Sequence, residues 1–171
     1  FVYGTLDRDG EITARVDSVS ATDSWTKAGV MIREELGPTA RFAYTLVSSG
    51  NGVDFNYRVS QGGAAAPFGT SDRVTRAPYW VRLRRIGNVF TSYVSPDGLA
   101  WRQHGSSVTV TMNATVYVGL AVCAVAQGHY ATAQFESYGD FGGYPGATIA
   151  ISQQPTNGTV NAGSGTPISV T

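Results

Sequence analysis

Apolar and polar residues alternate along most of this chain, in short runs that end at glycine, proline or asparagine. Successive side chains of a β-strand point to opposite faces, so the alternation predicts strands with one face in a core and the other outside it. No comparable stretch has apolar residues at helical spacing, and we therefore expect an all-β protein. The expected strands cover residues 11–19, 28–34, 41–47, 53–59, 79–86, 89–95, 116–125 and 130–138.

The segments between these strands have the composition of tight turns. They are Ser49-Gly50-Asn51-Gly52, Gly87-Asn88 and Ser95-Pro96-Asp97-Gly98. Proline presets the second position of a turn, and glycine tolerates the left-handed backbone that other residues avoid. Turns this short join neighbouring antiparallel strands, so the sheets should be mainly antiparallel. Trp101, just after the third turn, is expected to fold back onto the sheet.

Length and charge exclude several classes of protein. The chain has 171 residues, of which 42% are hydrophobic, and this is enough for one substantial core. Twelve basic and twelve acidic residues give a net charge of zero, so nucleic acid is not an expected partner. The longest apolar run, residues 116–126, is too short to span a bilayer, and the first four residues lack the pattern of a signal peptide. We therefore expect no membrane insertion.

The composition changes after Tyr138, where glycine and proline become frequent. This change predicts a sandwich domain at residues 1–140, a linker at 141–147 and a short β segment at 148–171. The last segment has too few residues to close a sandwich of its own.

Five segments in order carry a family resemblance: GEITARV at 10–16, KAGVMIR at 27–33, APYWVRL at 77–83, FTSYVSPDG at 90–98 and VYVGLAV at 116–122. Together they resemble the concanavalin A-like, or laminin-G-like, jelly-roll modules related to the C-terminal module of beta-xylosidases. The resemblance covers roughly residues 1–138 and implies an antiparallel two-sheet jelly-roll sandwich. It also implies that opening strands upstream of Phe1 are missing. The tail resembles the start of a bacterial immunoglobulin-like repeat.

The same resemblance implies a function. Such modules accompany secreted bacterial carbohydrate-active and cell-surface proteins, so we expect a non-catalytic accessory module that binds a polysaccharide or cell-surface glycan. Its location would be extracellular or at the cell surface, and its other partners would be neighbouring domains of a larger chain. The alternative is a structural or adhesive spacer in a multidomain surface protein or filament. A jelly-roll glycoside hydrolase is the third hypothesis.

Alternation also predicts which side chains face away from the core. If Val81 and Leu83 point inward, the residues between and beside them point outward, and the same reasoning applies to the neighbouring strands. We expect one sheet to present Arg33, Asn56, Arg58, Arg82 and Tyr93. Aromatic faces stack on sugar rings, while arginine and amide donors meet hydroxyl or carboxylate groups. Trp80 and the loop residue Trp25 complete the predicted ligand-binding set.

A structural explanation of these residues stays open. Trp80 is equally suited to covering a sheet edge, and the arginines are equally suited to pairing with Asp54 and Glu34. A thiol inside an apolar run behaves as a small hydrophobe, so we expect Cys123 to be buried and unreactive.

Acidic residues at Asp7, Asp9 and Glu11 have the period-two spacing of the paired carboxylates of jelly-roll glucanases. The turn dipeptide Asp9-Gly10 interrupts that spacing, so no catalytic residue is assigned. The same stretch leaves a structural calcium site open, built from Asp7, Asp9 or Asp140, and no other cofactor is expected. His104 and His129 are too few to form a first-row metal site, and we expect both at the surface or in turns.

Overall fold

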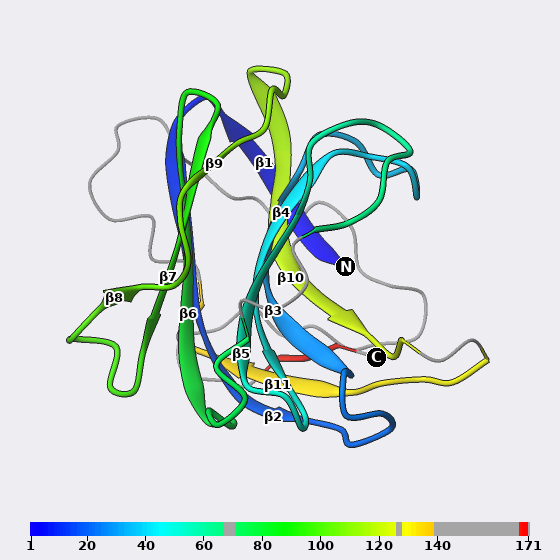
Figure 1. Ribbon diagram of the computed structural model, residues 1–171, viewed down its shortest axis with the longest axis vertical. Coiled ribbons are helices and arrows are strands. Elements are labelled where there is room, and N and C mark those ends of the chain that lie inside the picture. The colour runs from blue at the N-terminus through cyan, green and yellow to red at the C-terminus, as the bar shows by residue number, and fades with distance from the viewer. Residues whose placement is uncertain (67–70, 126–127, 139–167, 171) are drawn as a thin grey trace.

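The computed structural model of the chain describes residues 1–66, 71–125, 128–138 and 168–170. Its described residues form two antiparallel β-sheets, and they contain no helix. Figure 1 shows the sheets as two layers of strands, with the connecting loops gathered at the two ends. The predicted all-β sandwich of two antiparallel sheets is therefore confirmed.

The five-stranded sheet combines the start, the middle and a late part of the chain. Its strands are β1 (Val2–Asp7), β3 (Lys27–Arg33), β4 (Phe42–Ser48), β5 (Val53–Arg58) and β10 (Thr115–Cys123). Their order across the sheet is β1-β10-β3-β4-β5. The late strand β10 therefore lies between β1 and β3, and the register places Tyr117 opposite both Thr5 and Arg33.

The seven-stranded sheet forms the other layer. Its strands are β2 (Gly10–Val19), β6 (Tyr79–Ile86), β7 (Val89–Ser95), β8 (Arg102–Gln103), β9 (Val108–Thr109), β11 (Ala133–Glu136) and β12 (Ile168–Val170). The order is β12-β11-β2-β6-β7-β8, with the two-residue β9 also pairing with β7. This order makes β2 and β6 the centre of the layer.

The core lies between the layers and contains the inward residues of the alternating pattern. Phe55, Phe90 and Phe135 are its largest fully buried side chains. Val81 and Leu83 are fully buried on β6, as the alternation predicts. A buried hydrogen bond also joins the layers, because the Thr45 hydroxyl on β4 lies 3.0 Å from the Ser92 hydroxyl on β7. The two sheets are thus held by packing and by a polar contact inside it.

Strand positions agree with the sequence pattern over most of the described chain. The alternation missed β1 and the short strands β8 and β9, of which the last two are too brief for a periodic signal. The expected strand at 130–138 is shorter, because β11 covers only Ala133–Glu136. The predicted linker at 141–147 lies outside the described residues. Of the predicted tail segment, only β12 is described, and it pairs with β11.

Three predictions about individual side chains are wrong. Cys123 is exposed, because period two places it on the outward side of β10 with Tyr117 rather than with the core residues between them. Val59, which alternation along the expected strand 53–59 places in the core with Val53 and Phe55, is 50% exposed, since β5 ends at Arg58 and the inward alternation ends with it. His104 is buried at 5% exposure beside β7, where its backbone N–H donates to Ser92.

The described residues include no helix that is long and apolar enough to cross a membrane.

Candidate functional site

The structure divides the predicted ligand-binding residues between the two sheets. Arg33, Asn56 and Arg58 belong to β3 and β5 of the five-stranded sheet, whereas Trp80, Arg82 and Tyr93 belong to β6 and β7 of the other sheet. The prediction that one sheet presents the arginines and Tyr93 together is therefore wrong. Alternation separates inward from outward side chains, but it does not reveal which strands share a sheet.

The outer side of the seven-stranded sheet carries a continuous set of contacts, which we call the arginine network. It includes Glu11, Thr13, Trp80, Arg82, Arg84, Tyr93 and Trp101. Cross-strand register creates it, because Thr13 and Tyr93 both lie opposite Arg82, and Glu11 lies opposite Arg84.

Each arginine of the network has several protein partners. Arg82 Nε donates to the Thr13 hydroxyl at 3.1 Å, and its guanidinium carbon lies 3.9 Å from the centre of the Trp101 ring. Arg84 Nε donates to Glu11 Oε2 at 2.8 Å. Glu11 Oε1 also lies 3.6 Å from Arg82 Nε, so one nearly buried carboxylate serves both cations.

The rings of the network also contact one another. Trp80 and Trp101 meet edge to face with ring centres 6.5 Å apart, and Trp101 Nε1 donates to the Gly98 carbonyl at 2.9 Å. Trp101 therefore folds back onto the sheet, as predicted from its place after the turn. The arginine network presents half-buried ring edges, while much of its hydrogen-bonding capacity is used within the protein.

The arginines of the five-stranded sheet are bound to the loop between β3 and β4. Arg33 donates to the carbonyls of Glu35 and Gly37 at 2.6 Å each, and Arg58 donates to the Pro38 carbonyl at 2.7 Å. Burial lowers the pKa of Arg33 from its ordinary value, and the charge of Arg58 lowers it further. Asn56 donates to Asp54 Oδ2 at 3.0 Å. The two arginines therefore support the loop, whereas Asn56 is bound to a neighbour on its own strand.

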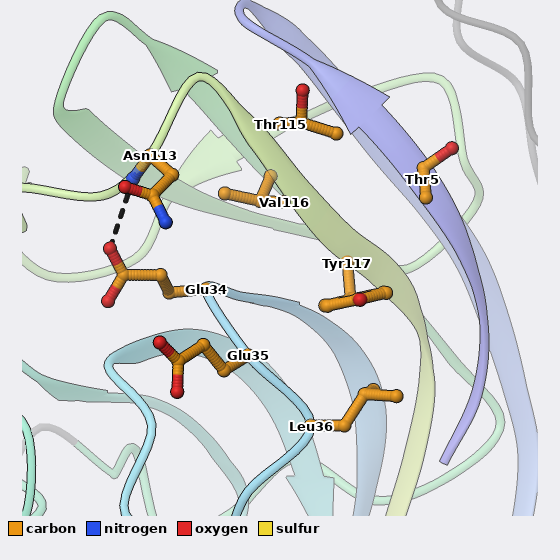
Figure 2. Close-up of a pocket in the computed structure, with 8 residues that line it drawn as sticks. All are labelled: Thr5, Glu34, Glu35, Leu36, Asn113, Thr115, Val116 and Tyr117. Atoms are coloured by element: carbon orange, nitrogen blue, oxygen red, sulfur yellow. Dashed lines mark hydrogen bonds between the residues drawn. The ribbon is translucent and has the colours of Figure 1, made fainter.

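That loop forms one wall of a pocket, which is shown in Figure 2. The pocket has a volume of about 380 Å³, within the range of small-molecule sites. Its lining comes from β1, β10, the loop after β3 and the residue Asn113 before β10. The residues are Thr5, Glu34, Glu35, Leu36, Asn113, Thr115, Val116 and Tyr117.

Glu34 is the structural anchor of the pocket. Arg41 donates to its two carboxylate oxygens at 2.6 and 2.8 Å, and the Asn113 backbone N–H donates to Oε1 at 3.1 Å, the contact dashed in Figure 2. Arg85 holds the segment before β10 that contains Asn113, because it donates to the Asn113 carbonyl at 2.7 Å. Burial lowers the pKa of Arg85, and the charges of Asp9, Asp7 and Glu34 oppose that shift.

Other polar groups of the pocket are not paired with protein groups in this way. Among the residues that the structure describes, no hydrogen bond or ion pair engages the Glu35 carboxylate, the Asn113 side-chain amide or the Tyr117 hydroxyl. Leu36, which is 46% exposed, supplies apolar surface beside the Tyr117 ring (Figure 2). A carboxylate and an amide thus meet an apolar wall, which is a combination suited to a hydroxylated ring such as a sugar.

The acidic residues at the turn between β1 and β2 each have a protein partner. Asp7 accepts the Thr115 hydroxyl at 3.2 Å, Asp9 accepts the Gly87 backbone N–H at 2.6 Å, and Glu11 belongs to the arginine network. Within the described ranges, no group of three histidine, cysteine, aspartate or glutamate residues is placed to hold a metal ion. Asp140, the third residue named for a calcium site, lies outside those ranges.

Trp25 lies apart from both surfaces, in the loop between β2 and β3. Its ring centre is 6.0 Å from Lys27 Nζ and 5.8 Å from the guanidinium carbon of Arg73. Its backbone N–H donates to Asp23 Oδ1 at 2.7 Å. Within the described chain, no hydrogen bond, ion pair or ring contact joins it to another of the predicted ligand-binding residues.

Comparison with known proteins gives two structural neighbours. No family model and no curated protein matches the sequence. The GH43 protein BlXynB from Bacillus licheniformis, crystallised as a mutant, is 15% identical over 75% of this chain with a TM-score of 0.60, and the match spans 26% of its own length. A functionally unknown protein from Saccharomyces cerevisiae is 21% identical over 72% of this chain, with a TM-score of 0.49 and 64% of its length covered. At these identities the likeness to BlXynB concerns the fold alone.

Proposed function

We propose that this chain is a non-catalytic accessory module that binds polysaccharide, and that the pocket between β1, β10 and the loop after β3 receives the sugar. The observation that carries the proposal is the pairing of uncommitted polar groups with an apolar wall. Glu35 accepts from vicinal hydroxyls, the Asn113 amide donates to a third, and Leu36 and Tyr117 cover carbon-bound hydrogens of the ring.

The place of the module in a longer protein belongs to the same proposal. The solved neighbour BlXynB is about four times as long as the matched part, so a comparable sandwich exists there within a larger chain. We propose that neighbouring domains accompany this chain too, and that the parent protein is secreted or attached to the cell surface. Detection of the full-length protein in culture medium or on intact cells tests the location.

The arrangement of carboxylates supports a binding role over hydrolysis. A glycosidase needs two carboxyl groups on opposite sides of the scissile bond, separated by about 5–5.5 Å or about 6.5–9.5 Å. In the pocket, Glu34 is held by Arg41 and the Asn113 backbone, which leaves Glu35 as the uncommitted acid. Reducing ends released from oligosaccharides during prolonged incubation would contradict the non-catalytic assignment.

Calorimetric titration with neutral oligosaccharides tests the binding role. We expect Glu35→Gln to weaken binding by about 1–3 kcal/mol, because it removes contacts made only with the ligand. Tyr117→Ala should weaken binding similarly by removing the ring that covers the sugar, a ring that also packs edge to face on Tyr3 with centres 5.3 Å apart. Glu136→Gln is the matched control, since Glu136 lies on the other sheet, where it accepts from Arg15 at 2.6 Å. If the two pocket variants bind the sugar with the same affinity as the wild type, the sugar does not bind in this pocket.

One observation favours the spacer as a second candidate function. The contacts of the arginine network join β2, β6, β7 and the segment carrying Trp101, and they need no ligand. Such cross-strand contacts would stiffen a module whose role is structural. A spacer should bind none of a panel of soluble and insoluble polysaccharides. A panel without any binder would favour the spacer over the binding module.

A further inference from the structure

A group of cations surrounds Trp25 at the end of the sandwich opposite the β1–β2 turn. Lys27 begins β3, and Arg73 and Arg76 come from the loop before β6. Lys27 and Arg73 both lie within about 6 Å of the Trp25 ring centre. We call these four residues the Trp25 cluster.

Backbone contacts hold the cluster together. The Arg76 guanidinium donates to the Gly50 carbonyl at 2.7 Å and to the Thr75 carbonyl at 2.9 Å, which ties its loop to the turn between β4 and β5. That turn in turn contacts the Trp25 loop, because the Asn51 side-chain amide donates to the Ser24 carbonyl at 2.9 Å. Three loops from distant parts of the sequence therefore meet at one place.

Asp72 gives the Arg73 loop its shape. Its carboxylate accepts the backbone N–H groups of Val53 at 3.2 Å, Val74 at 3.2 Å and Thr75 at 3.1 Å. Arg73 itself adopts a left-handed backbone with φ of 62°. Non-glycine residues rarely adopt that conformation, and it persists only where surrounding contacts maintain it. The position of Arg73 is thus imposed by the loop.

Within the described chain, five of the twelve basic residues form an ion pair with a carboxylate, and the cations of the cluster are not among them. Arg15, Arg41, Arg82, Arg84 and Arg102 each form an ion pair with a carboxylate. Lys27, Arg73 and Arg76 form none within the described chain. The nearby acids are already engaged, since Asp23 accepts the Trp25 N–H, and Asp72 is bound to its own loop and to Arg102.

We propose that the Trp25 cluster binds an acidic polysaccharide through its carboxylate or sulfate groups. Three cations without carboxylate partners lie together in a chain with no net charge, so they form a local positive field that an anionic chain would neutralise. A glycan is favoured over a nucleic acid because the chain has no net charge and a pI of about 6.9. The site is separate from the pocket, and it does not depend on the sugar bound there.

Binding of polygalacturonate and dextran sulfate, with neutral dextran as reference, tests the proposal. We expect the double variant Lys27→Gln/Arg73→Gln to lose about tenfold or more in affinity for both anionic polymers, as expected for the loss of charge-assisted contacts. Wild-type affinity should also fall between about 50 mM and about 200 mM NaCl. Arg73→Gln alone, at an exposed position, provides a variant whose folding is not in question. Arg8→Gln, an exposed residue at the opposite end, is the matched control and should bind as wild type.

Each other outcome overturns the inference. If the wild-type protein binds neither anionic polymer, or binds neutral dextran equally well, the proposal that the ligand is anionic is wrong. Unchanged affinity of both cluster variants would place binding elsewhere. If a single-stranded oligonucleotide binds more tightly than either polysaccharide, the preferred ligand of the cluster is a nucleic acid and not a glycan. Glu35→Gln should leave the anionic polymers bound, so a failure of the pocket proposal is distinguishable from a failure of this one.

Discussion

The outer side of the seven-stranded sheet and the pocket beside the five-stranded sheet use similar residue types in different ways. In the arginine network, Glu11 is nearly buried and accepts from Arg84 while lying close to Arg82. In the pocket, Glu35 is exposed, and its carboxylate has no partner among the described residues. The first carboxylate therefore belongs to the stability of the fold, and the second is available to a ligand.

Residue type alone therefore does not identify a binding surface. Tryptophan, tyrosine and arginine on an outward face fit the description of a sugar-binding platform, yet here they contact one another. Availability of polar groups is the better criterion, because a group already paired in the protein gains little from pairing with a ligand. The predictions below test the two regions against each other.

The largest effect is expected from Glu11→Gln. The substitution removes the charge that two arginines share, and we expect the free energy of unfolding to fall by about 2 kcal/mol, a value reduced for the partial exposure of the arginines. Urea denaturation of Glu11→Gln and Glu35→Gln measures the contrast. Glu35→Gln should remain within about 0.5 kcal/mol of the wild type. Similar losses in both variants would show that the two carboxylates contribute equally to the stability of the fold.

Trp101→Ala should have the next largest effect on stability. It removes the ring on which Arg82 lies and the edge-to-face contact with Trp80, and we expect a loss of about 1.5 kcal/mol. Trp101→Phe should recover part of this loss. Thermal denaturation that shows no change in Trp101→Ala would mean that the ring is not part of the structural network and is available to a ligand.

Gly98→Ala should destabilise the protein by about 1 kcal/mol. Gly98 has φ of 77°, and a Cβ atom there would lie 2.8 Å from Trp80 Cε2. Gly62→Ala is the matched control, because Gly62 has φ of 71° but no atom within 4 Å of an added Cβ. The difference between the two variants in chemical denaturation isolates the contact with Trp80. Equal losses would show that backbone strain alone is responsible.

A pH dependence is expected at the Asp72 loop. Burial raises the pKa of Asp72, but hydrogen bonds from Thr75, Val74 and Val53 outweigh it and hold the pKa below its ordinary value of 3.8. A lowered folded-state pKa means that its stabilising contribution is present above the unfolded-state value and is lost as pH falls through the folded-state value. The hydrogen-exchange protection factors of the Val74 and Thr75 amides, which are corrected for the intrinsic exchange rate at each pH, should therefore fall on acidification in the wild type. Asp72→Asn should remove that pH dependence of the protection factors.

The smallest effect on stability is expected at Cys123, because chemical modification of its thiol should leave the free energy of unfolding unchanged. The thiol is exposed at the end of β10, and we expect native protein to react with a thiol reagent at a rate close to that of the unfolded chain. Mass spectrometry of briefly treated native and urea-unfolded protein gives the two rates. Protection in the native state would contradict the outward position of this strand end.

Alternation predicted the strands and much of the core, because burial on one face leaves a period-two record in the sequence. It did not predict that β3 and β6 lie in different sheets, because strand order depends on contacts between residues far apart in the chain. Asp54 shows another limit. It lies on the outward side of β5 as predicted, yet it is only 4% exposed.

The pocket left no signal in the sequence. Its lining combines Thr5, the three residues at 34–36 and the residues at 113 and 115–117, and no local motif links them. Only the insertion of β10 between β1 and β3 brings them together. The cations around Trp25 are similar in this respect, because Lys27 and Arg73 are 46 positions apart. Aromatic and basic residues were recognised as candidates, but their partners were set by the fold.

The position of β10 also determines when this protein can complete its folding. β1 and β3 are synthesised before β10, yet both pair with it, so the five-stranded sheet stays divided until the strand that begins at Thr115 has left the ribosome. Pairings across such long sequence separations favour slow folding, on the order of milliseconds to seconds. Until then β1 has no neighbour and β3 has one open edge, and unpaired edges of this kind are where nascent β-proteins associate with one another.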